Sequence, residues 1–116
     1  MSIRNYADVY RALAEPNRLR IIKMLEVKPL CVCEITEVLQ LAASTVSKHL
    51  SILRDAGLII DQKDGKWVNY CLNDSPDQHQ VRQLLNLLAE ELADDKVVRA
   101  DAKKAAVVDR LDICDI

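Results

Sequence analysis

Apolar side chains recur through the first part of this chain at the spacing of a helix that buries one face. In residues 5–14 they occupy the i, i+3, i+4 and i+7 positions of a single face, namely Tyr6, Val9, Tyr10 and Leu13. Pro16 ends this run and suits the first turn of a second helix, which the apolar pattern extends to about Glu26. The opening residues therefore predict two consecutive helices.

Two shorter helices are predicted next, over Cys33–Gln40 and Ser44–Ala56, with a turn at residues 41–43 between them. The hydroxyl of Ser44 can accept a hydrogen bond from an amide two or three residues on, so Ser44 is the expected cap of the second helix. Gly57 is expected to end that helix. Two helices joined by a turn of three or four residues form a helix-turn-helix.

Over residues 58–72 the pattern changes to two strand-like runs on either side of Asp64-Gly65, a strong signal for a hairpin turn. Beyond this hairpin, Ser75 is a candidate cap and Pro76 the candidate first residue of a longer helix. That helix carries a dense apolar stripe, which consists of Val81, Leu84, Leu85, Leu88 and Leu92. A stripe of this density predicts packing against a partner.

The formal net charge is −2, which on its own does not favour nucleic acid as a partner. The charge is unevenly distributed, because residues 1–70 carry ten Lys and Arg against eight Asp and Glu, and residues 71–116 carry six against ten. A mildly basic front half can still bind DNA if its basic groups share one face.

No apolar run approaches the roughly 20 residues of a membrane span. The first six residues also lack the apolar stretch of a signal peptide, so we expect a cytoplasmic protein with no membrane partner.

The helix predicted over Ser44–Ala56 has an outward face suited to the major groove of DNA. With Val46, Leu50 and Leu53 buried, its first two turns present small hydroxyls and one lysine, which let a helix approach base edges and phosphates. Lysines beside the hairpin turn can reach the DNA backbone. The candidate DNA-binding residues are Ser44, Thr45, Ser47, Lys48, His49, Lys63 and Lys66. A solvated helix face is the alternative, and His49 can instead form hydrogen bonds within the domain.

The order of the elements predicts a mainly α-helical fold with a β-hairpin wing, a winged helix-turn-helix. Residues 1–93 are expected to form a DNA-binding and dimerisation domain, since 116 residues suit a single domain. Residues 94–116 are compatible with a helix but rich in alanine and charge, so we expect a C-terminal helical extension or a tail there. A chain this small buries only about two thirds of its unfolded surface, and we therefore expect a homodimer formed through terminal helices.

Cys31 and Cys33 stand at the predicted start of the first helix of the helix-turn-helix. Thiolates prefer thiophilic ions such as trivalent arsenic or antimony, lead, cadmium, mercury, Cu(I) and zinc. On a regular helix, residues i and i+2 lie about 200° apart, so both sulfurs can bind one ion only where the segment is extended or the first turn unwinds. Such a change would move the reading helix out of register with DNA. The alternative is two cysteines that simply pack in an apolar helix start.

The third ligand of such a site has several candidates. Cys114 can reach back within its own subunit or across a dimer, and it is the tentative choice. Cys71, at the end of the second hairpin strand, is expected to be packed. Water or an external thiol such as glutathione can complete the site instead. In a cytoplasmic protein, cysteines are more often ligands, reactive thiols or buried residues than disulfides.

Four segments of the chain resemble the ArsR/SmtB family of metal-responsive winged-helix repressors, in particular its arsenic-responsive members. They are Leu13–Ile21, Leu30–Ile35, Ser44–Leu50 and Gly65–Tyr70. The resemblance implies a homodimer that binds a palindromic double-stranded operator, needs no cofactor to do so, and is released by arsenite or antimonite. It also implies that Cys31 and Cys33 form the inducer site.

The chain departs from this family pattern in places. Some arsenic-responsive members have a third cysteine shortly after the pair, where this chain has Ile35, Thr36 and Glu37. Cadmium- and lead-responsive members add N-terminal cysteines, which this chain lacks, and that difference favours arsenic. Zinc-type members use Asp-x-His and a later His pair, of which Asp77 and His79 match only the first half.

The alternative function is a repressor of the same fold that responds to another thiophilic metal (Cd, Pb or Zn) or to thiol oxidation. An enzyme is not expected, because the chain has no Cys-x-x-Cys pair and no cofactor-binding glycine loop. Its only glycines are Gly57 and Gly65.

Overall fold

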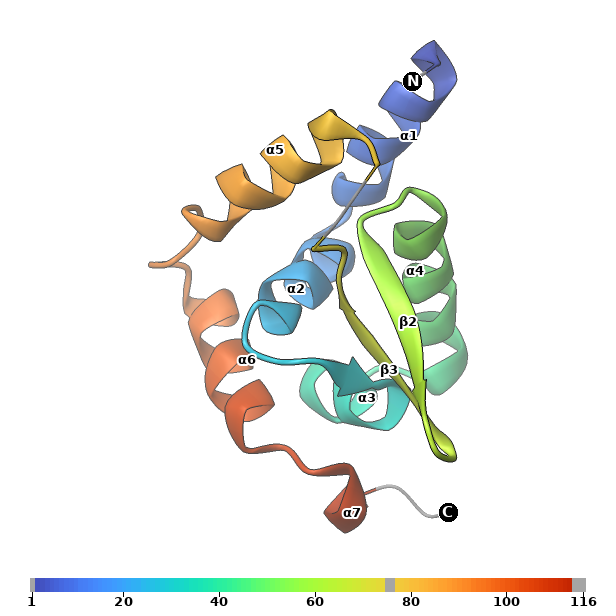
Figure 1. The fold of residues 1–116 in the computed structure, drawn as a ribbon. Coiled ribbons are helices and arrows are strands. Elements are labelled where there is room, and N and C mark those ends of the chain that lie inside the picture. The colour runs from blue at the N-terminus through green and yellow to red at the C-terminus, as the bar shows by residue number, and fades with distance from the viewer. Residues whose placement is uncertain (1, 75–76, 114–116) are drawn as a thin grey trace.

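The computed structural model describes residues 2–74 and 77–113 of this chain. The helices are α1 (Ile3–Leu13), α2 (Pro16–Leu25), α3 (Val32–Leu39), α4 (Ala43–Asp55), α5 (His79–Ala89), α6 (Lys96–Val107) and α7 (Arg110–Ile113). The strands are β1 (Leu30–Cys31), β2 (Ile59–Asp64) and β3 (Trp67–Leu72). Figure 1 shows α2 between α4 on one side and α6 on the other, with α1 and α5 at one end and the hairpin turn at the opposite end. The predicted winged helix-turn-helix is confirmed.

The sheet is antiparallel and has the strand order β1-β3-β2. Its hairpin pairs Ile59 with Leu72 at one end and Asp64 with Trp67 at the other, so that Gly65 and Lys66 form a two-residue loop. Gly65 has a φ of +63°, a conformation that glycine adopts without steric cost and that tight hairpin loops require. The predicted hairpin is therefore confirmed. Its loop consists of Gly65 and Lys66, one residue later than the Asp64-Gly65 signal.

The strand β1 was not predicted, because two residues are too few to show an alternating pattern. It pairs Leu30 with Tyr70 and Cys31 with Asn69. This pairing attaches the residue that precedes α3 directly to the second strand of the wing. The first cysteine therefore belongs to the sheet, and only the second belongs to the helix.

A single core of aliphatic side chains lies among α1–α4, the sheet, α5 and α6. Its largest fully buried members are Ile21, Ile22, Met24, Leu30, Ile35, Leu50, Leu53, Leu58 and Ile59. Burial of each such side chain contributes about 1.5–3 kcal/mol. Because these residues come from α2, α3, α4 and the starts of the edge strands β1 and β2, the core fixes the helix-turn-helix against the base of the wing.

The predicted cap of α4 was wrong. The helix begins at Ala43 after an extended Ala42 (φ −62°, ψ 145°), and no side chain caps it. Ser44 lies in the first helical turn, where its backbone is already helical. The opposite end follows the prediction, since Gly57 with a φ of +82° comes directly after the last helical residues. The candidate cap Ser75 and the candidate first helical residue Pro76 lie outside the described residues.

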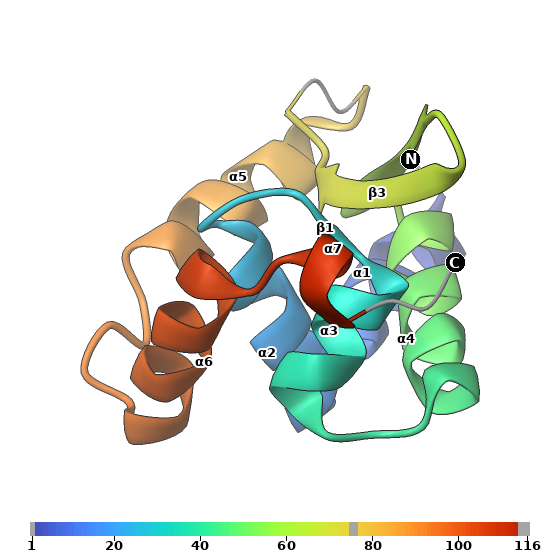
Figure 2. The ribbon, with the colours of Figure 1, turned by 90° about the horizontal axis from the view of Figure 1, so that it is seen from below.

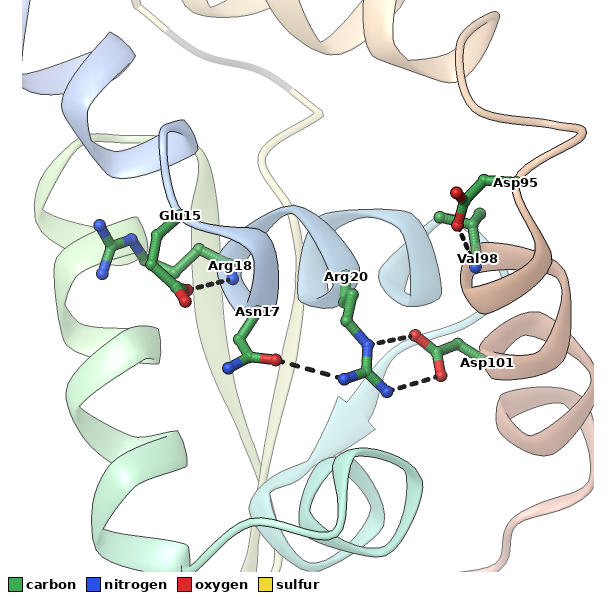
Figure 3. A network of polar contacts seen from close by, with 7 residues as sticks. All are labelled: Glu15, Asn17, Arg18, Arg20, Asp95, Val98 and Asp101. Atoms are coloured by element: carbon green, nitrogen blue, oxygen red, sulfur yellow. Dashed lines mark hydrogen bonds and ion pairs between the residues drawn. The ribbon is translucent and has the colours of Figure 1, made fainter.

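The segment after α5 forms a separate helix that packs on the core. Ala105 of α6 is completely buried, and Asp101 accepts two hydrogen bonds from the Arg20 guanidinium of α2, from Nε at 2.8 Å and from Nη2 at 3.0 Å (Figure 3). These hydrogen bonds raise the pKa of Arg20. Lys28 adds a contact at the other end of α6, where its Nζ donates to the Val108 carbonyl at 2.9 Å. The domain boundary expected after residue 93 stays a prediction.

No helix among residues 2–74 and 77–113 is long and apolar enough to cross a membrane.

Replacing Asp101 with alanine is expected to lower the free energy of unfolding by about 2–3 kcal/mol, because it leaves the half-buried Arg20 guanidinium without its partner. Urea unfolding measures the change. Asp94→Ala is the matched control, since Asp94 is exposed in the connection before α6 and exposed substitutions change stability by less than about 0.5 kcal/mol. Equal stability of the two variants would contradict a structural role for the Arg20–Asp101 pair.

Candidate functional site

The helix-turn-helix consists of α3 and α4, which pack against each other and are joined by residues 40–42. Gln40 ends α3 in the left-handed conformation (φ 58°, ψ 42°), which stops a helix abruptly. Val46, Leu50 and Leu53 are buried, so the opposite face of α4 is turned to solvent, as predicted. The turn and the buried stripe together fix which side chains α4 can present to a ligand.

The N-terminal half of α4 carries an exposed polar surface. Ser44, Thr45, Ser47 and Lys48 are all exposed. No side chain caps the helix, and the amide groups of an uncapped helix start favour an anion such as phosphate. Small hydroxyls, one lysine and an open helix N-terminus form a surface that fits a nucleic-acid backbone and groove.

His49 lies at the edge of this surface and contacts other parts of the domain. Its Nδ1 is 3.3 Å from Nη1 of Arg18 and 3.8 Å from the Glu15 carboxylate. Glu15 in turn caps α2 by accepting from the Arg18 amide at 2.9 Å (Figure 3). Burial acts to raise the pKa of Glu15, but the amides of Arg18 and Asn17 and the neighbouring positive groups lower it overall. The geometry favours the role of His49 within the domain.

The wing presents two of the predicted basic residues at its tip. Lys63 and Lys66 are exposed, and they lie on either side of Asp64 and Gly65. The Lys66 Nζ lies over the Trp67 ring, 5.7 Å from its centroid, so the aromatic ring helps to hold one of these cations. Together with α4, the wing gives a second positive surface on the same unit.

The sulfur of Cys31 caps the first helix of the helix-turn-helix. Cys31 has an extended backbone (φ −89°, ψ 171°) and immediately precedes α3. The Glu34 amide donates to the Cys31 sulfur, and the Cys31 amide donates to the Glu34 carboxylate at 2.9 Å. This reciprocal arrangement is a capping box in which a thiol stands where serine or threonine is usual. The start of α3 therefore depends on the sulfur.

Cys31 is only 4% exposed and carries a free thiol. Burial raises the pKa of the Cys31 thiol, and the neighbouring Glu34 charge raises it further, although the backbone amides of Glu34 and Cys33 act in the opposite direction. A thiol with a raised pKa is mostly protonated at neutral pH. Its reactivity is therefore controlled by burial and by Glu34.

The other cysteines differ in their surroundings. Cys33 is the second residue of α3, is half-buried, and forms a disulfide bond. Cys71 lies in β3 with a free, half-buried thiol whose pKa is raised by burial and by Asp74. Cys114 lies outside the described residues. Within residues 2–74 and 77–113, no three His, Cys, Asp or Glu side chains are close enough to hold a metal ion, so Cys31 and Cys33 would need a ligand from elsewhere.

Three residues of this region were not predicted from the sequence. Glu34 had a recognisable signal, because it stands three residues after Cys31 as in a Ser-x-x-Glu capping box. Arg18 bridges the last carbonyls of α1 to His49 through hydrogen bonds at 2.6–3.3 Å. Arg110 contacts the wing from α7. No local pattern indicates either arginine, since their partners are distant in sequence.

The model of the family described as "Bacterial regulatory protein, arsR family" matches residues 15–61. The matched segment runs from the cap of α2 through α3 and α4 into β2. It therefore contains the helix-turn-helix and both Cys31 and Cys33.

Known proteins are similar to this chain beyond that segment. The arsenical resistance operon repressor of Bacillus subtilis is 37% identical over 91 residues, which are 78% of this chain and 80% of that protein. The arsenical resistance operon repressor of Escherichia coli is 41% identical over 67 residues, and the match spans 57% of each chain. A cadmium resistance regulatory protein CadC homologue of Staphylococcus aureus is 34% identical over 80 residues, 68% of this chain and 63% of that protein.

The fold is also similar to solved structures. The homodimeric winged helix-turn-helix DNA-binding domain of Mb0332 from Mycobacterium bovis, a possible ArsR-family transcriptional regulator, superimposes with a TM-score of 0.64 at 26% identity. The superposition covers 74% of this chain and 76% of that chain.

Replacing Glu34 with glutamine is expected to lower the pKa of the Cys31 thiol, because the substitution removes a negative charge but keeps an acceptor for the Cys31 amide. Burial remains, so the pKa stays above the ordinary thiol value. Site-resolved alkylation by iodoacetamide on reduced protein, followed by mass spectrometry between pH 7 and pH 10, measures the change. Glu37→Gln, an exposed position on the same helix, is the control. Identical pH profiles in wild type and Glu34→Gln would refute the charge effect.

Proposed function

This chain belongs to the ArsR family of bacterial regulatory proteins, and from that premise we propose that it is a homodimeric transcriptional repressor released from operator DNA by trivalent arsenic. The observation that carries the proposal is the position of Cys31, whose sulfur caps the first helix of the helix-turn-helix. A group that binds thiophilic ions is thereby part of the element that positions the DNA-reading helix.

The DNA-binding surface of this proposal is the exposed side of α4 together with the wing. Ser44, Thr45, Ser47 and Lys48 enter the major groove or contact its phosphates, and Lys63 and Lys66 contact the backbone beside it. The uncapped start of α4 adds amide donors for a phosphate. We retain His49 as a candidate at the edge, where it aligns α4 through Arg18 rather than reading a base. No cofactor is needed for this binding.

The dimer surface of this proposal lies between α1 and α5. Tyr6, Tyr10, Leu84 and Leu87 line a groove there, and the two tyrosine rings contact each other with centroids 5.3 Å apart and planes tilted by 47°. Tyr6 and Tyr10 are almost half-exposed, and Leu87 more than half, which is unusual for side chains of this size in neighbouring helices. Two-fold pairing of two reading helices favours a palindromic double-stranded operator.

The inducer site of this proposal is the pair Cys31 and Cys33. Trivalent arsenic or antimony favours thiolate ligands. Cys31 is extended and precedes the helix, whereas Cys33 lies in the first turn of α3, so the helical spacing that separates residues i and i+2 does not apply to this pair. Use of the Cys31 sulfur as a ligand also removes the acceptor of the Glu34 amide. Loss of this acceptor loosens the first turn of α3, and α3 transmits the change to α4 through their shared packing.

We propose Cys114 as the third ligand. It lies outside the described residues, but Ile113 immediately before it lines a pocket with Glu37 and Val38 of α3. The chain therefore returns to the helix that carries Cys33 just before its last cysteine. A third thiolate from this position would complete a site that the described residues leave with two cysteines. We propose a cytoplasmic location, where the disulfide bond of Cys33 would be reduced to a thiol that can bind an ion.

The predicted DNA contacts can be tested by the salt dependence of binding to a duplex selected by the wild-type protein from a random pool. Lys63→Ala and Lys66→Ala are each expected to weaken binding and to lower the salt slope by about one, as the loss of one phosphate contact does. Lys103→Ala is the matched control, because Lys103 is exposed on α6, across the molecule from α4 (Figure 1). A wing that contacts no phosphate would leave the slope unchanged in all three variants.

The inducer site can be tested by titrating reduced protein with arsenite and following the ultraviolet thiolate-to-arsenic absorption. Cys31→Ser and Cys33→Ser are expected to lose most of this absorption and to stay bound to the selected duplex when arsenite is added. Serine also caps a helix, so Cys31→Ser is expected to keep DNA affinity without arsenite. Cys71→Ser is the control, and Cys114→Ser tests the third ligand.

Cadmium, lead and zinc salts form the competing arms of this titration, since the similar Staphylococcus aureus protein carries a cadmium-resistance name. Release of DNA by arsenite in the Cys31→Ser, Cys33→Ser double variant would overturn the proposed site. Release of DNA by cadmium but not by arsenite would show that the inducer is cadmium. The assignment of Cys31 and Cys33 as ligands would then stand.

A further inference from the structure

The short helix α7 reaches across to the tip of the wing through one side chain. The Arg110 Nη1 donates to the Asn69 side chain at 3.0 Å, and its Nη2 pairs with the Asp64 carboxylate at 3.0 Å. The guanidinium carbon lies over the Trp67 ring, 4.7 Å from the centroid. One arginine therefore touches both strands of the hairpin, and the Arg110 side chain is only 23% exposed in doing so.

Another side chain that reaches the wing is Arg54 of α4, whose Nη1 pairs with the Asp61 carboxylate at 3.2 Å, closer to the base of the hairpin. The last four residues of β2 are exposed, and β1 pairs with β3 only at Tyr70 and Asn69. The hairpin beyond those residues is a two-stranded ribbon, which is marginally stable by itself. The contact with Arg110 is therefore a restraint on the part of the hairpin that carries Lys63 and Lys66.

The same helix also contacts the element that carries the cysteines. Figure 2 shows α7 against α3, close to β1, and the two helices pack together. Val38 of α3 lines a pocket with Val108 and Ile113. Asn69, which accepts from Arg110, is also the residue that pairs with Cys31 across β1 and β3. The segment from residue 108 to residue 113 thus bridges the start of the helix-turn-helix and the wing.

We propose that α7 is a strap that couples the cysteine-bearing start of α3 to the wing, with Arg110 as the positioning residue that attaches it. In this role Arg110 contacts no DNA itself. It holds the wing where its lysines meet the phosphates, and displacement of α3 loosens the wing through α7. Only the coupling to α3 rests on the proposed arsenic site, because attachment of the wing is a property of the free protein.

The attachment can be measured without DNA or metalloid, because Trp67 is the only tryptophan of the chain. Acrylamide quenching of its fluorescence reports how far the ring is covered. Arg110→Ala and Asp64→Asn are expected to raise the Stern–Volmer constant, since each breaks the contact from one side. Arg99→Ala removes the same charge from an exposed position of α6 and is expected to leave quenching unchanged, and circular dichroism verifies that all variants are folded. Unchanged quenching in Arg110→Ala and Asp64→Asn would overturn the attachment.

The effect on DNA separates a positioning role from a direct phosphate contact. Arg110→Ala is expected to bind the selected duplex about three- to tenfold more weakly, the size expected for the loss of one ion pair and one cation–π contact, with an unchanged salt slope. Arg110→Lys keeps the charge but cannot bridge two partners and stack at once, so it is expected to weaken binding as well. Full affinity in Arg110→Lys, or a slope lowered by about one in Arg110→Ala, would show a phosphate contact and refute the positioning role.

The coupling requires arsenite as the probe, with reduced protein and no DNA. Arsenite is expected to raise Trp67 quenching in the wild type, to have no effect in Cys31→Ser, and to add nothing in Arg110→Ala. If arsenite releases DNA from the wild type but leaves Trp67 quenching unchanged, the strap is refuted and the inducer site stands. If arsenite does not bind even the wild-type protein, the proposed inducer is wrong. The attachment of the wing by Arg110 is then judged by the measurements made without arsenite.

Discussion

The structure depends most on the hydrogen bonds at the start of α3, where a thiol occupies the capping position of a helix. The amides of the first helical turn have no partners within the helix and must find them elsewhere. Here the Cys31 sulfur accepts from the Glu34 amide, and Glu34 returns the contact to the Cys31 amide. The same sulfur is buried and belongs to β1. A change of ligand at this atom therefore reaches the sheet and the helix-turn-helix together.

In the proposed mechanism, packing carries a change at Cys31 to the DNA-reading helix. The buried faces of α3 and α4 share one aliphatic core with α2 and the base of the hairpin, and cores of this density shift between discrete arrangements rather than deform gradually. The helix α6 is attached to α2 and the core by other contacts, namely the Arg20–Asp101 pair and the buried Ala105. In the proposed mechanism, α2 and α6 are the frame against which α3, α4 and the wing are displaced.

Cation contacts with the wing show how charge is used in a protein whose net charge is slightly negative. Lys63 and Lys66 are placed at the tip, while Arg110 lies over Trp67 and between Asn69 and Asp64. The acidic C-terminal part of the chain therefore contributes a basic residue that contacts the wing. Distribution of charge over the surface, rather than its sum, governs the affinity for nucleic acid in such a case.

The sequence by itself determined the helical segments, the hairpin and the candidate thiols. Apolar periodicity and the turn signals at Gly57 and Gly65 are local patterns, and such patterns can be recognised without knowledge of the fold. Tertiary structure alone decided the rest. The two-residue β1 exists only because β3 is there to pair with it, and α4 begins before Ser44 because an extended Ala42 ends the turn one residue earlier. His49 contacts Arg18, thirty-one residues away, and Arg110 reaches Asp64 over forty-six. Contacts between residues so far apart in the chain leave no spacing that a single sequence can reveal.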